Sequence, residues 1–339
     1  MNSGLSFCKT SKRCYDLASG DDGGFVTLFD TRRNTKKISE WRAHEETGIF
    51  GQVILDVGWI KEDTQILTAA GDETIKVWDV EEKKCLATLW GHRDWIESIC
   101  SHPTNDDIFV SGSNDRSFRL WDLRCKSTVS IPNEDTIFST AVVERANLYH
   151  RSDGGRVDAM GLTSVLWLKD QFTIATAGSK HSTVKFWDAR FLKQGVTYKG
   201  PLPKSTEKQK LHAFDGITSL SQDERGVLLT ASSMDNRIYL YNILELGKRA
   251  LSYFEGHTIR KYSKAAISPD ALNIASGCDH GTTYVWQVNK PHERTILMPA
   301  NEKEDAYKVD WSCCEPGKLA TGGNYNIQIW NKDIEIPEQ

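Results

Sequence analysis

The chain has 339 residues, a formal net charge of −4, 39% hydrophobic and 26% charged residues. This is an ordinary soluble composition, and it gives no basis for direct nucleic-acid binding or membrane attachment. The eight cysteines include no C-x-x-C pair, so we expect neither a zinc site nor another metal or cofactor, and we place the thiols in the cytosol or nucleus.

Seven apolar segments, each ending in an aromatic and a polar residue, follow one another along the chain. They read FVTLFD, TIKVWD, SFRLWD, TVKFWD, RIYLYN, TTYVWQ and NIQIWN, and they end at residues 30, 79, 122, 188, 242, 287 and 331. Four spacings between their aromatic residues are 49, 43, 45 and 44 residues, close to the blade length of WD-repeat propellers. The other two, 66 and 54 residues, indicate insertions near 130–160 and 191–215. The pattern predicts an all-β fold, a single seven-bladed WD-repeat β-propeller over residues 1–339.

Two repeats contain the polar residues from which WD repeats build a buried hydrogen-bond relay. These sets are His44, Thr68, Asp72 and Trp78, and His92, Ser111, Asp115 and Trp121. A hydrolase triad is the alternative, but a triad occurs once, whereas these sets recur in successive blades. Phosphate-loop, dinucleotide, zinc-protease and nucleophile-elbow motifs are missing from the sequence, so we expect a non-catalytic protein.

Later repeats depart from the relay pattern. His181 and His280 stand near the position of the turn aspartate, and Asn324 does so in the seventh repeat. We expect those blades to be held less tightly by this relay. How the ring closes is open: Ile334 and Ile336 alternate with charged residues and could form the last strand, or the ring is shortened at its start.

Two consecutive repeats carry an arginine two residues after the Trp-Asp pair. A strand from Phe118 to Arg124 spans about 23 Å, which predicts that Arg124 emerges at the rim opposite the Asp115 turn. Arg190 then emerges at the same rim one blade further on. Two adjacent arginines suit a docking patch. The alternative is an ion pair between Asp122 and Arg124 that serves only the strand surface.

The segment FVSGSNDRSFRLWDLR, residues 109–124, resembles a 16-residue box of WD-repeat substrate receptors of cullin-4 RING ubiquitin ligases. A second, weaker copy has His181 where the box expects an acid. The resemblance implies docking on the adaptor of these ligases, damaged-DNA-binding protein subunit 1. The implied adaptor-binding residues are Trp121, Asp122, Arg124, Trp187, Asp188 and Arg190.

Most of the chain is similar to the denticleless family, on segments such as LTAAGDETIKVWDV and AISPDALNIASGCDHGTTYVWQV. The resemblance implies a nuclear substrate-recognition subunit, with the cytoplasm as the alternative location. Its implied partners are the adaptor propeller and degron-bearing replication and cell-cycle proteins on the replication clamp, presented for ubiquitin-dependent degradation. Longer family members continue beyond the propeller into a tail with further interaction motifs. Whether this chain contacts the clamp through such a tail is not decided by its sequence. The alternative is a WD-repeat scaffold that binds a peptide or histone tail and serves no ligase.

Candidates for substrate binding lie in the loops expected at the other rim. They are Arg93, Trp95, Arg260, Tyr262 and Lys264, because exposed aromatic and arginine side chains often dominate protein interfaces. The alternative for Trp95 is packing beneath its own loop. The lysine-rich insertion near 191–215 is either a solvated loop or an electrostatic guide toward DNA or an acidic surface.

Overall fold

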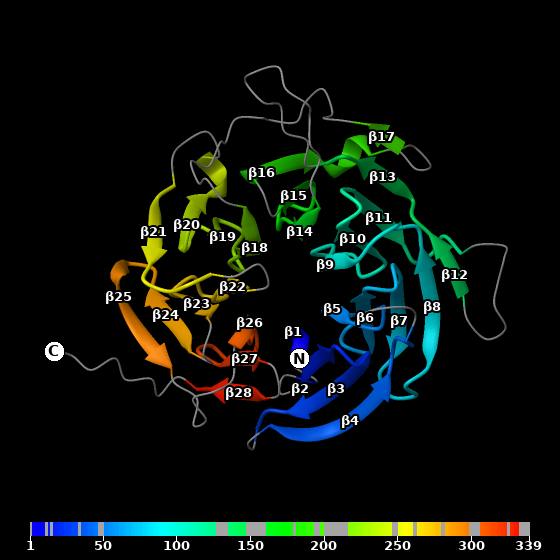
Figure 1. Ribbon diagram of the computed structural model, residues 1–339, viewed down its shortest axis with the longest axis horizontal. Coiled ribbons are helices and arrows are strands. Elements are labelled where there is room, and N and C mark those ends of the chain that lie inside the picture. Colours follow the sequence, from blue (N-terminus) through cyan, green and yellow to red (C-terminus); the bar gives the residue numbers. More distant parts are fainter. Residues whose placement is uncertain are drawn as a thin grey trace.

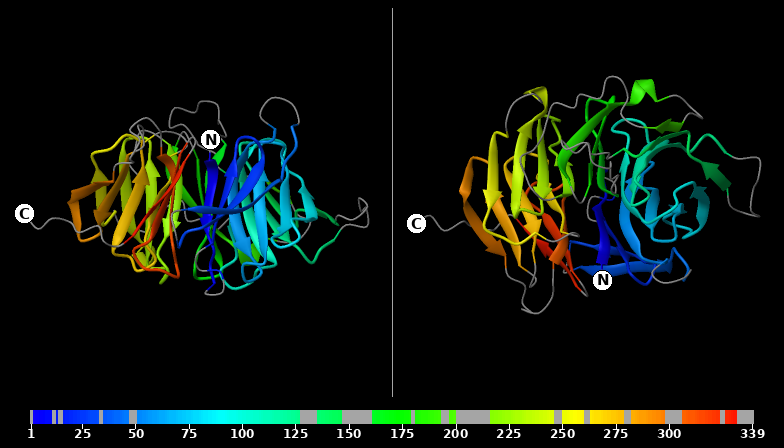
Figure 2. Two further views of the ribbon diagram at one scale, coloured as in Figure 1. Left: turned by 90° about the horizontal axis from the view of Figure 1, so that it is seen from below. Right: turned by 45° about the horizontal axis from the view of Figure 1, so that its top comes forward.

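The structure is a computed structural model, and seven sheets form a closed ring in it (Figure 1). This confirms the predicted all-β, seven-bladed propeller. Seen from the side, the sheets stand next to one another in a flattened disc (Figure 2). The residues that the structure describes are 2–10, 13, 16–32, 35–46, 51–126, 135–146, 161–178, 181–192, 197–199, 216–245, 250–259, 263–278, 282–297, 306–323 and 326–331.

We number the blades in chain order and give their strands from the central channel outward. Blade 1 holds β1 (Asn2–Phe7), β2 (Asp16–Asp21), β3 (Phe25–Asp30) and β4 (Lys36–Arg42). Blade 2 holds β5 (Ile54–Ile60), β6 (Gln65–Ala70), β7 (Ile75–Asp79) and β8 (Cys85–Trp90). Blade 3 holds β9 (Ile96–Ser101), β10 (Ile108–Ser113), β11 (Phe118–Asp122) and β13 (Ala141–Glu144).

The remaining blades follow the same order. Blade 4 holds β14 (Leu162–Trp167), β15 (Thr173–Gly178) and β16 (His181–Asp188), followed by a 3₁₀ turn η1 (Ala189–Phe191). Blade 5 holds β18 (Ile217–Gln222), β19 (Leu228–Ser233), β20 (Arg237–Asn242) and β21 (Ser252–Glu255), with η2 (Ile243–Glu245) after β20. Blade 6 holds β22 (Ala265–Ile267), β23 (Asn273–Gly277), β24 (Thr283–Gln287) and β25 (Lys290–Leu297), and blade 7 holds β26 (Ala306–Trp311), β27 (Leu319–Gly323) and β28 (Ile327–Trp330).

Both predicted insertions contribute strands to blades that precede them. Strand β12 (Asp135–Phe138) pairs parallel with β8, and β17 (Thr197–Lys199) pairs parallel with β13. Blades 2 and 3 therefore gain a fifth, outer strand. Within the described residues, blades 4 and 7 have three strands each.

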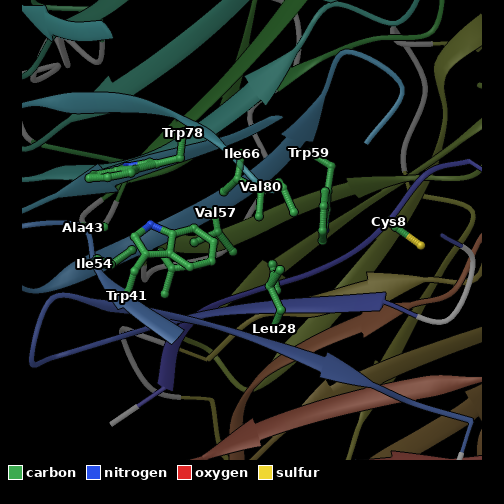
Figure 3. Close-up of a cluster of buried hydrophobic side chains, with 12 residues drawn as sticks. Cys8, Leu28, Trp41, Ala43, Ile54, Val57, Trp59, Ile66, Trp78 and Val80 are labelled. Atoms are coloured by element: carbon green, nitrogen blue, oxygen red, sulfur yellow. The ribbon is translucent and has the colours of Figure 1, made fainter. Parts of the chain in front are cut away.

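The hydrophobic cores lie between neighbouring blades, because each sheet buries side chains on both faces. Between blades 1 and 2, the indole rings of Trp41 and Trp78 lie 6.2 Å apart, and Val57 and Ile66 pack in the same cluster (Figure 3). Burial of such side chains supplies the main stabilisation of the fold, roughly 1.5–3 kcal/mol for each large apolar residue.

Hydrogen bonds also join the inner strands around the channel. In successive blades, a side-chain oxygen of one inner strand accepts an N–H of the next: Asp56 from Ile99 over 2.9 Å, Ser98 from Val165 over 3.2 Å, Ser164 from Leu220 over 3.1 Å and Ser219 from Ala265 over 2.9 Å. Asp310 of blade 7 makes the same kind of bond to blade 1 by accepting the Phe7 N–H over 2.7 Å. Because hydrogen bonds are directional, these bonds fix the position of each inner strand relative to its neighbour.

The ring closes without a strand shared between blades 1 and 7 in the described residues, since β1 is the inner strand of blade 1. Leu5, Phe7 and Leu17 of blade 1 instead pack on Ala320 of blade 7. Ile334 and Ile336, the expected last strand, lie outside the described residues, so that prediction stays open. No helix among the residues that the structure describes is long and apolar enough to cross a membrane.

Candidate functional site

The propeller has two rims that differ in chemistry. Because neighbouring strands of a blade are antiparallel, loops from first to second and from third to fourth strands lie at one rim, which carries Arg32, Arg124 and Arg190. We call it the arginine rim. The other loops form the histidine rim, which carries His44 and His92.

Blade 3 joins a leading-loop histidine to the tryptophan of its third strand through a chain of hydrogen bonds. Trp121 Nε1–H donates to Ser111 Oγ over 2.8 Å, and Ser111 Oγ lies 2.7 Å from His92 Nε2. His92 Nδ1 lies 2.8 Å from Asp115 Oδ2. An indole N–H only donates and a carboxylate only accepts, so the hydroxyl donates to Nε2, and Nδ1–H donates to Asp115.

Blade 2 contains the same chain with threonine in place of serine. Trp78 Nε1–H donates to Thr68 Oγ1 over 3.2 Å, His44 Nε2 lies 2.8 Å from the same oxygen, and His44 Nδ1 lies 2.7 Å from Asp72 Oδ2. The structure thus brings both predicted sets of four residues together.

The electrostatics of the blade 3 relay fit a packing role. Burial alone would raise the pKa of Asp115, but the hydrogen bonds that it accepts from His92 and Ser117 outweigh burial and hold this pKa well below its usual range. Burial lowers the pKa of His92, so its ring is neutral at pH 7. A neutral imidazole fixed between two buried partners has no free nitrogen with which to act as a base.

Later blades keep only parts of the relay. Trp187 Nε1–H donates to Thr176 Oγ1 over 2.9 Å in blade 4, and Trp330 Nε1–H donates to Thr321 Oγ1 over 3.1 Å in blade 7. In blade 6, His257 is buried, yet neither ring nitrogen has a hydrogen-bond partner in the described part of the chain. The side chain of His181 and all of His280 and Asn324 lie outside the described residues.

At the arginine rim, Arg124 is fixed by the carboxylate of Asp122. The Asp122 oxygens accept the Arg124 backbone N–H over 3.0 Å, Nε–H over 2.8 Å and Nη2–H over 2.7 Å. Strand β11 ends at Asp122 rather than at Arg124, because a turn begins there. The Cys125 N–H donates to the Asp122 carbonyl and closes this turn. The Arg124 side chain is 59% exposed, and its hydrogen bonds with Asp122 raise its pKa further.

Arg190 repeats this arrangement one blade further on. Asp188 accepts its backbone N–H over 3.0 Å, Nε–H over 2.9 Å and Nη2–H over 2.6 Å. Its guanidinium carbon lies 4.8 Å from the ring centroid of Phe172, so the cation also stacks on an aromatic face.

Trp121 and Trp187, which the sequence grouped with the arginines as adaptor-binding residues, are 0% and 2% exposed. Their indoles belong to the interior of blades 3 and 4, where each donates to a strand hydroxyl. Both indoles stabilise the blade interior and are too buried to contact a partner. Asp122 and Asp188 contribute by accepting the hydrogen bonds that orient Arg124 and Arg190.

Blade 1 carries a third copy that the sequence reasoning missed. Asp30 accepts the Arg32 backbone N–H over 2.9 Å, Nε–H over 3.0 Å and Nη2–H over 2.6 Å. The pattern Trp-Asp-x-Arg does not match this copy, because its aromatic residue is Phe29. Placing the arginine three residues after each blade's aromatic residue would have found it.

The same turn recurs with other side chains at that position. The N–H of Glu81 donates to Asp79 over 2.9 Å in blade 2, and the N–H of Leu244 donates to Asn242 over 2.9 Å in blade 5. Blades 1 to 5 therefore each present one side chain at this position of the arginine rim, and its chemistry varies from blade to blade.

The predicted substrate-binding residues are spread over the histidine rim. Arg93 is exposed, and its backbone N–H donates to Asp115 over 3.1 Å. Trp95 is half-buried, and its carbonyl accepts the Asn114 N–H over 2.9 Å. Arg260 and Tyr262 lie outside the described residues.

Lys264 directly precedes β22, the inner strand of blade 6. Its Nζ is 2.8 Å from Asp56 Oδ1, which connects blade 6 to the inner strand of blade 2. Burial and the positive charge of Lys264 lower the pKa of Lys308, on the inner strand of blade 7, to about 7. The Lys264 side chain is thus engaged in an ion pair within the protein. No group of three or more His, Cys, Asp or Glu residues in the described ranges could hold a metal ion.

Comparison with known proteins agrees with this architecture. The family described as WD domain, G-beta repeat matches residues 35–79, 83–122 and 248–287. A denticleless protein homolog of Gallus gallus is 30% identical over 96% of this chain, and one of Mus musculus is 27% identical over 99%. Protein lethal(2)denticleless of Drosophila melanogaster is 25% identical over 85% of the chain. The chain spans about half the length of the first two relatives, 47% of each, and 39% of the third. It belongs to the denticleless family of WD-repeat proteins.

Proposed function

We propose that this chain is the substrate-recognition subunit of a cullin-4 RING ubiquitin ligase and docks on the adaptor, damaged-DNA-binding protein subunit 1, through Arg124 and Arg190. The observation that carries the proposal is one side-chain arrangement repeated on adjacent blades at one rim. In both copies an aspartate holds the guanidinium through Nε and Nη2. Kinship with the denticleless family supports the identity of the partner.

Stability alone does not account for these pairs. The two arginine side chains are 59% and 62% exposed, and ion pairs in such positions add little to folding. Fixing a guanidinium in advance does favour docking, because less side-chain entropy is then lost on association. Arg124 and Arg190 make their hydrogen bonds to Asp122 and Asp188 through Nε and Nη2, which leaves Nη1 to bind an acceptor on the partner.

The receptor role assigns the two rims to two partners. With the adaptor on the arginine rim, the histidine rim with Arg93 and Trp95 remains open to substrates. In this reading the substrates are nuclear replication and cell-cycle proteins whose degron is displayed on the replication clamp. The chain itself catalyses nothing: holding substrate near the ubiquitin-transferring enzyme raises its effective concentration there.

The test is direct binding of purified chain to purified adaptor, with Kd measured by biolayer interferometry. The double variant Arg124→Ala and Arg190→Ala should weaken binding by more than about thirtyfold, as expected for two interface hot spots. Arg32→Ala is the matched control, because it removes the same local arrangement from blade 1. It should leave Kd within about twofold, since surface positions outside a footprint contribute little.

Unchanged thermal unfolding of the three proteins would show that the variants are folded. Binding of the double variant at wild-type affinity would contradict docking through these arginines. Failure of the wild-type chain to bind the adaptor at all would contradict the ligase role and leave a scaffold for peptides or histone tails.

A further inference from the structure

Large exposed apolar side chains gather on one arc of the arginine rim. Five of the ten such side chains in the described residues lie there, in loops of blades 4 to 6: Phe172, Phe191, Leu244, Leu251 and Leu272, with exposed fractions of 47%, 49%, 78%, 56% and 59%. We call these five residues the apolar belt. Single exposed leucines are normal on a protein surface, but a group on one arc marks a binding surface.

The belt is presented by an ordered backbone. The Phe172 carbonyl accepts the Ala189 N–H over 2.7 Å, and the Leu272 carbonyl accepts the Val288 N–H over 2.9 Å. The Leu251 N–H donates to the Leu240 carbonyl over 2.8 Å. Hydrogen bonds therefore hold the backbone at these three positions, so little order has to be gained there when a partner covers the side chains.

Loops of the three blades are also bonded to one another. Lys169 of blade 4 donates its N–H to Gln222 of blade 5 over 3.0 Å and pairs with Glu224 over 2.9 Å. The Glu224 N–H donates to the Pro269 carbonyl of blade 6 over 3.2 Å. The arc therefore behaves as one continuous surface across blades 4, 5 and 6.

The belt begins at one of the docking arginines. Phe172 lies under the guanidinium of Arg190, with 4.8 Å between the guanidinium carbon and the ring centroid. In blade 5, Leu244 occupies the position that Arg190 holds in blade 4, on the same kind of turn. The chemistry of this position thus changes from cationic in blades 3 and 4 to apolar in blade 5.

The apolar belt does not extend to the loops of blades 1 and 2 at the arginine rim. Blades 1 and 2 place Arg32 and Glu81 at the same position, and none of the ten exposed apolar side chains lies in their loops at this rim. Interfaces typically have an apolar centre enriched in aromatic residues and arginine, and they bury about 800 Å² on each partner. Two arginine side chains cover much less than this area, so an interface of this size includes further residues of the rim.

We infer that the adaptor footprint extends from Arg124 and Arg190 across the apolar belt, which supplies the apolar centre of the interface. This inference rests on the proposed function. The adaptor surface that binds this footprint is expected to be folded. It presents carboxylates or carbonyls to the two arginines and apolar side chains to Phe172, Leu244 and Leu272.

The experiment is isothermal titration calorimetry of purified chain with purified adaptor at several temperatures. The double variant Leu244→Ser and Leu272→Ser should weaken binding at least about tenfold, because two exposed apolar side chains no longer become buried. It should also make the heat-capacity change of binding less negative, since that change reports apolar burial. Ile38→Ser is the matched control: Ile38 is 51% exposed on β4 of blade 1 and should have no effect.

The outcomes separate this inference from the proposed function. If the leucine variant binds like wild type while the arginine variant loses binding, the belt is wrong and the adaptor docking stands. If neither variant loses binding, both are wrong. Self-association of the wild-type chain in sedimentation velocity that disappears in the leucine variant, with adaptor binding intact, would assign the belt to a second copy and overturn the inference.

Discussion

Blades 3 and 6 bury a histidine at the same repeat position but give it different surroundings. His92 stands 29 residues before Trp121, and His257 stands 29 residues before Trp286. His92 has a partner on each ring nitrogen, whereas His257 has none among the described residues. The repeat period thus fixes where a histidine is buried, but the partners at other repeat positions decide whether burial stabilises the blade.

Blade 6 replaces hydrogen bonds by ring packing. The His257 centroid lies 4.8 Å from that of Trp286 and 5.7 Å from that of Tyr284. Burial and the nearby cation of Arg294 lower the pKa of His257 to about 4, so the ring is neutral at pH 7. A neutral ring between two aromatic rings is well packed, yet its two polar nitrogens remain unsatisfied.

The largest expected effect comes from breaking the complete relay. Asp115→Ala leaves the fully buried His92 and the Ser117 hydroxyl without their acceptor. Leaving two buried donors without an acceptor should lower the free energy of unfolding by about 3 kcal/mol. Equilibrium urea unfolding, followed by tryptophan fluorescence, measures this change.

The matched control is Asp235→Ala, which changes the same repeat position in blade 5. Asp235 is half-buried and accepts the Tyr239 hydroxyl over 2.6 Å, so its loss should cost about 1 kcal/mol. Equal losses for the two variants would mean that the blade 3 relay adds nothing beyond an ordinary hydrogen bond.

The sequence predicted the features that repeat. Aromatic residues at a regular spacing located the third strand of every blade, and the polar residues around Trp78 and Trp121 identified two relays that the structure shows hydrogen bonded. Arg124 and Arg190 were placed at one rim for the same reason. A repeating pattern is readable in one sequence because each copy supports the others.

Features that occur once were not predictable. Strand β12 pairs with β8, and β17 with β13, across blades, and short parallel pairings leave no periodic signal. The link between Lys264 and Asp56 spans the channel between blades 6 and 2, which depends on the closed ring. The apolar belt is likewise assembled from loops of three blades, and no stretch of the chain contains it.

Acidification should act on blade 6 through His257. Its pKa is about 4 in the folded chain, against about 6.5 for an exposed histidine, so between these values the unfolded chain binds a proton that the folded chain does not. Through this group the free energy of unfolding is highest above pH 6.5 and decreases as the pH falls toward 4. Between pH 7.5 and pH 5 this group should cost about 2 kcal/mol.

Urea unfolding of wild type and His257→Leu at both pH values measures this loss as the difference between their pH dependences. Other groups titrate in both proteins and cancel in that difference. Identical pH dependence in the two proteins would mean that His257 takes up its proton in the folded chain as readily as in the unfolded chain.

The smallest expected effect, and the one whose sign separates the two blades, is His257→Leu at pH 7.5. Leucine keeps apolar contact with Trp286 and Tyr284 and removes two buried nitrogens that have no partner among the described residues, so the free energy of unfolding should rise by about 1 kcal/mol. In blade 3, His92→Leu should lower the free energy of unfolding, because Asp115 and Ser111 lose their partner.

Both variants are measured by urea unfolding under one set of conditions. A loss in His257→Leu as large as in His92→Leu would show that blade 6 also depends on hydrogen bonds to its histidine, and the contrast between the two blades would then be wrong.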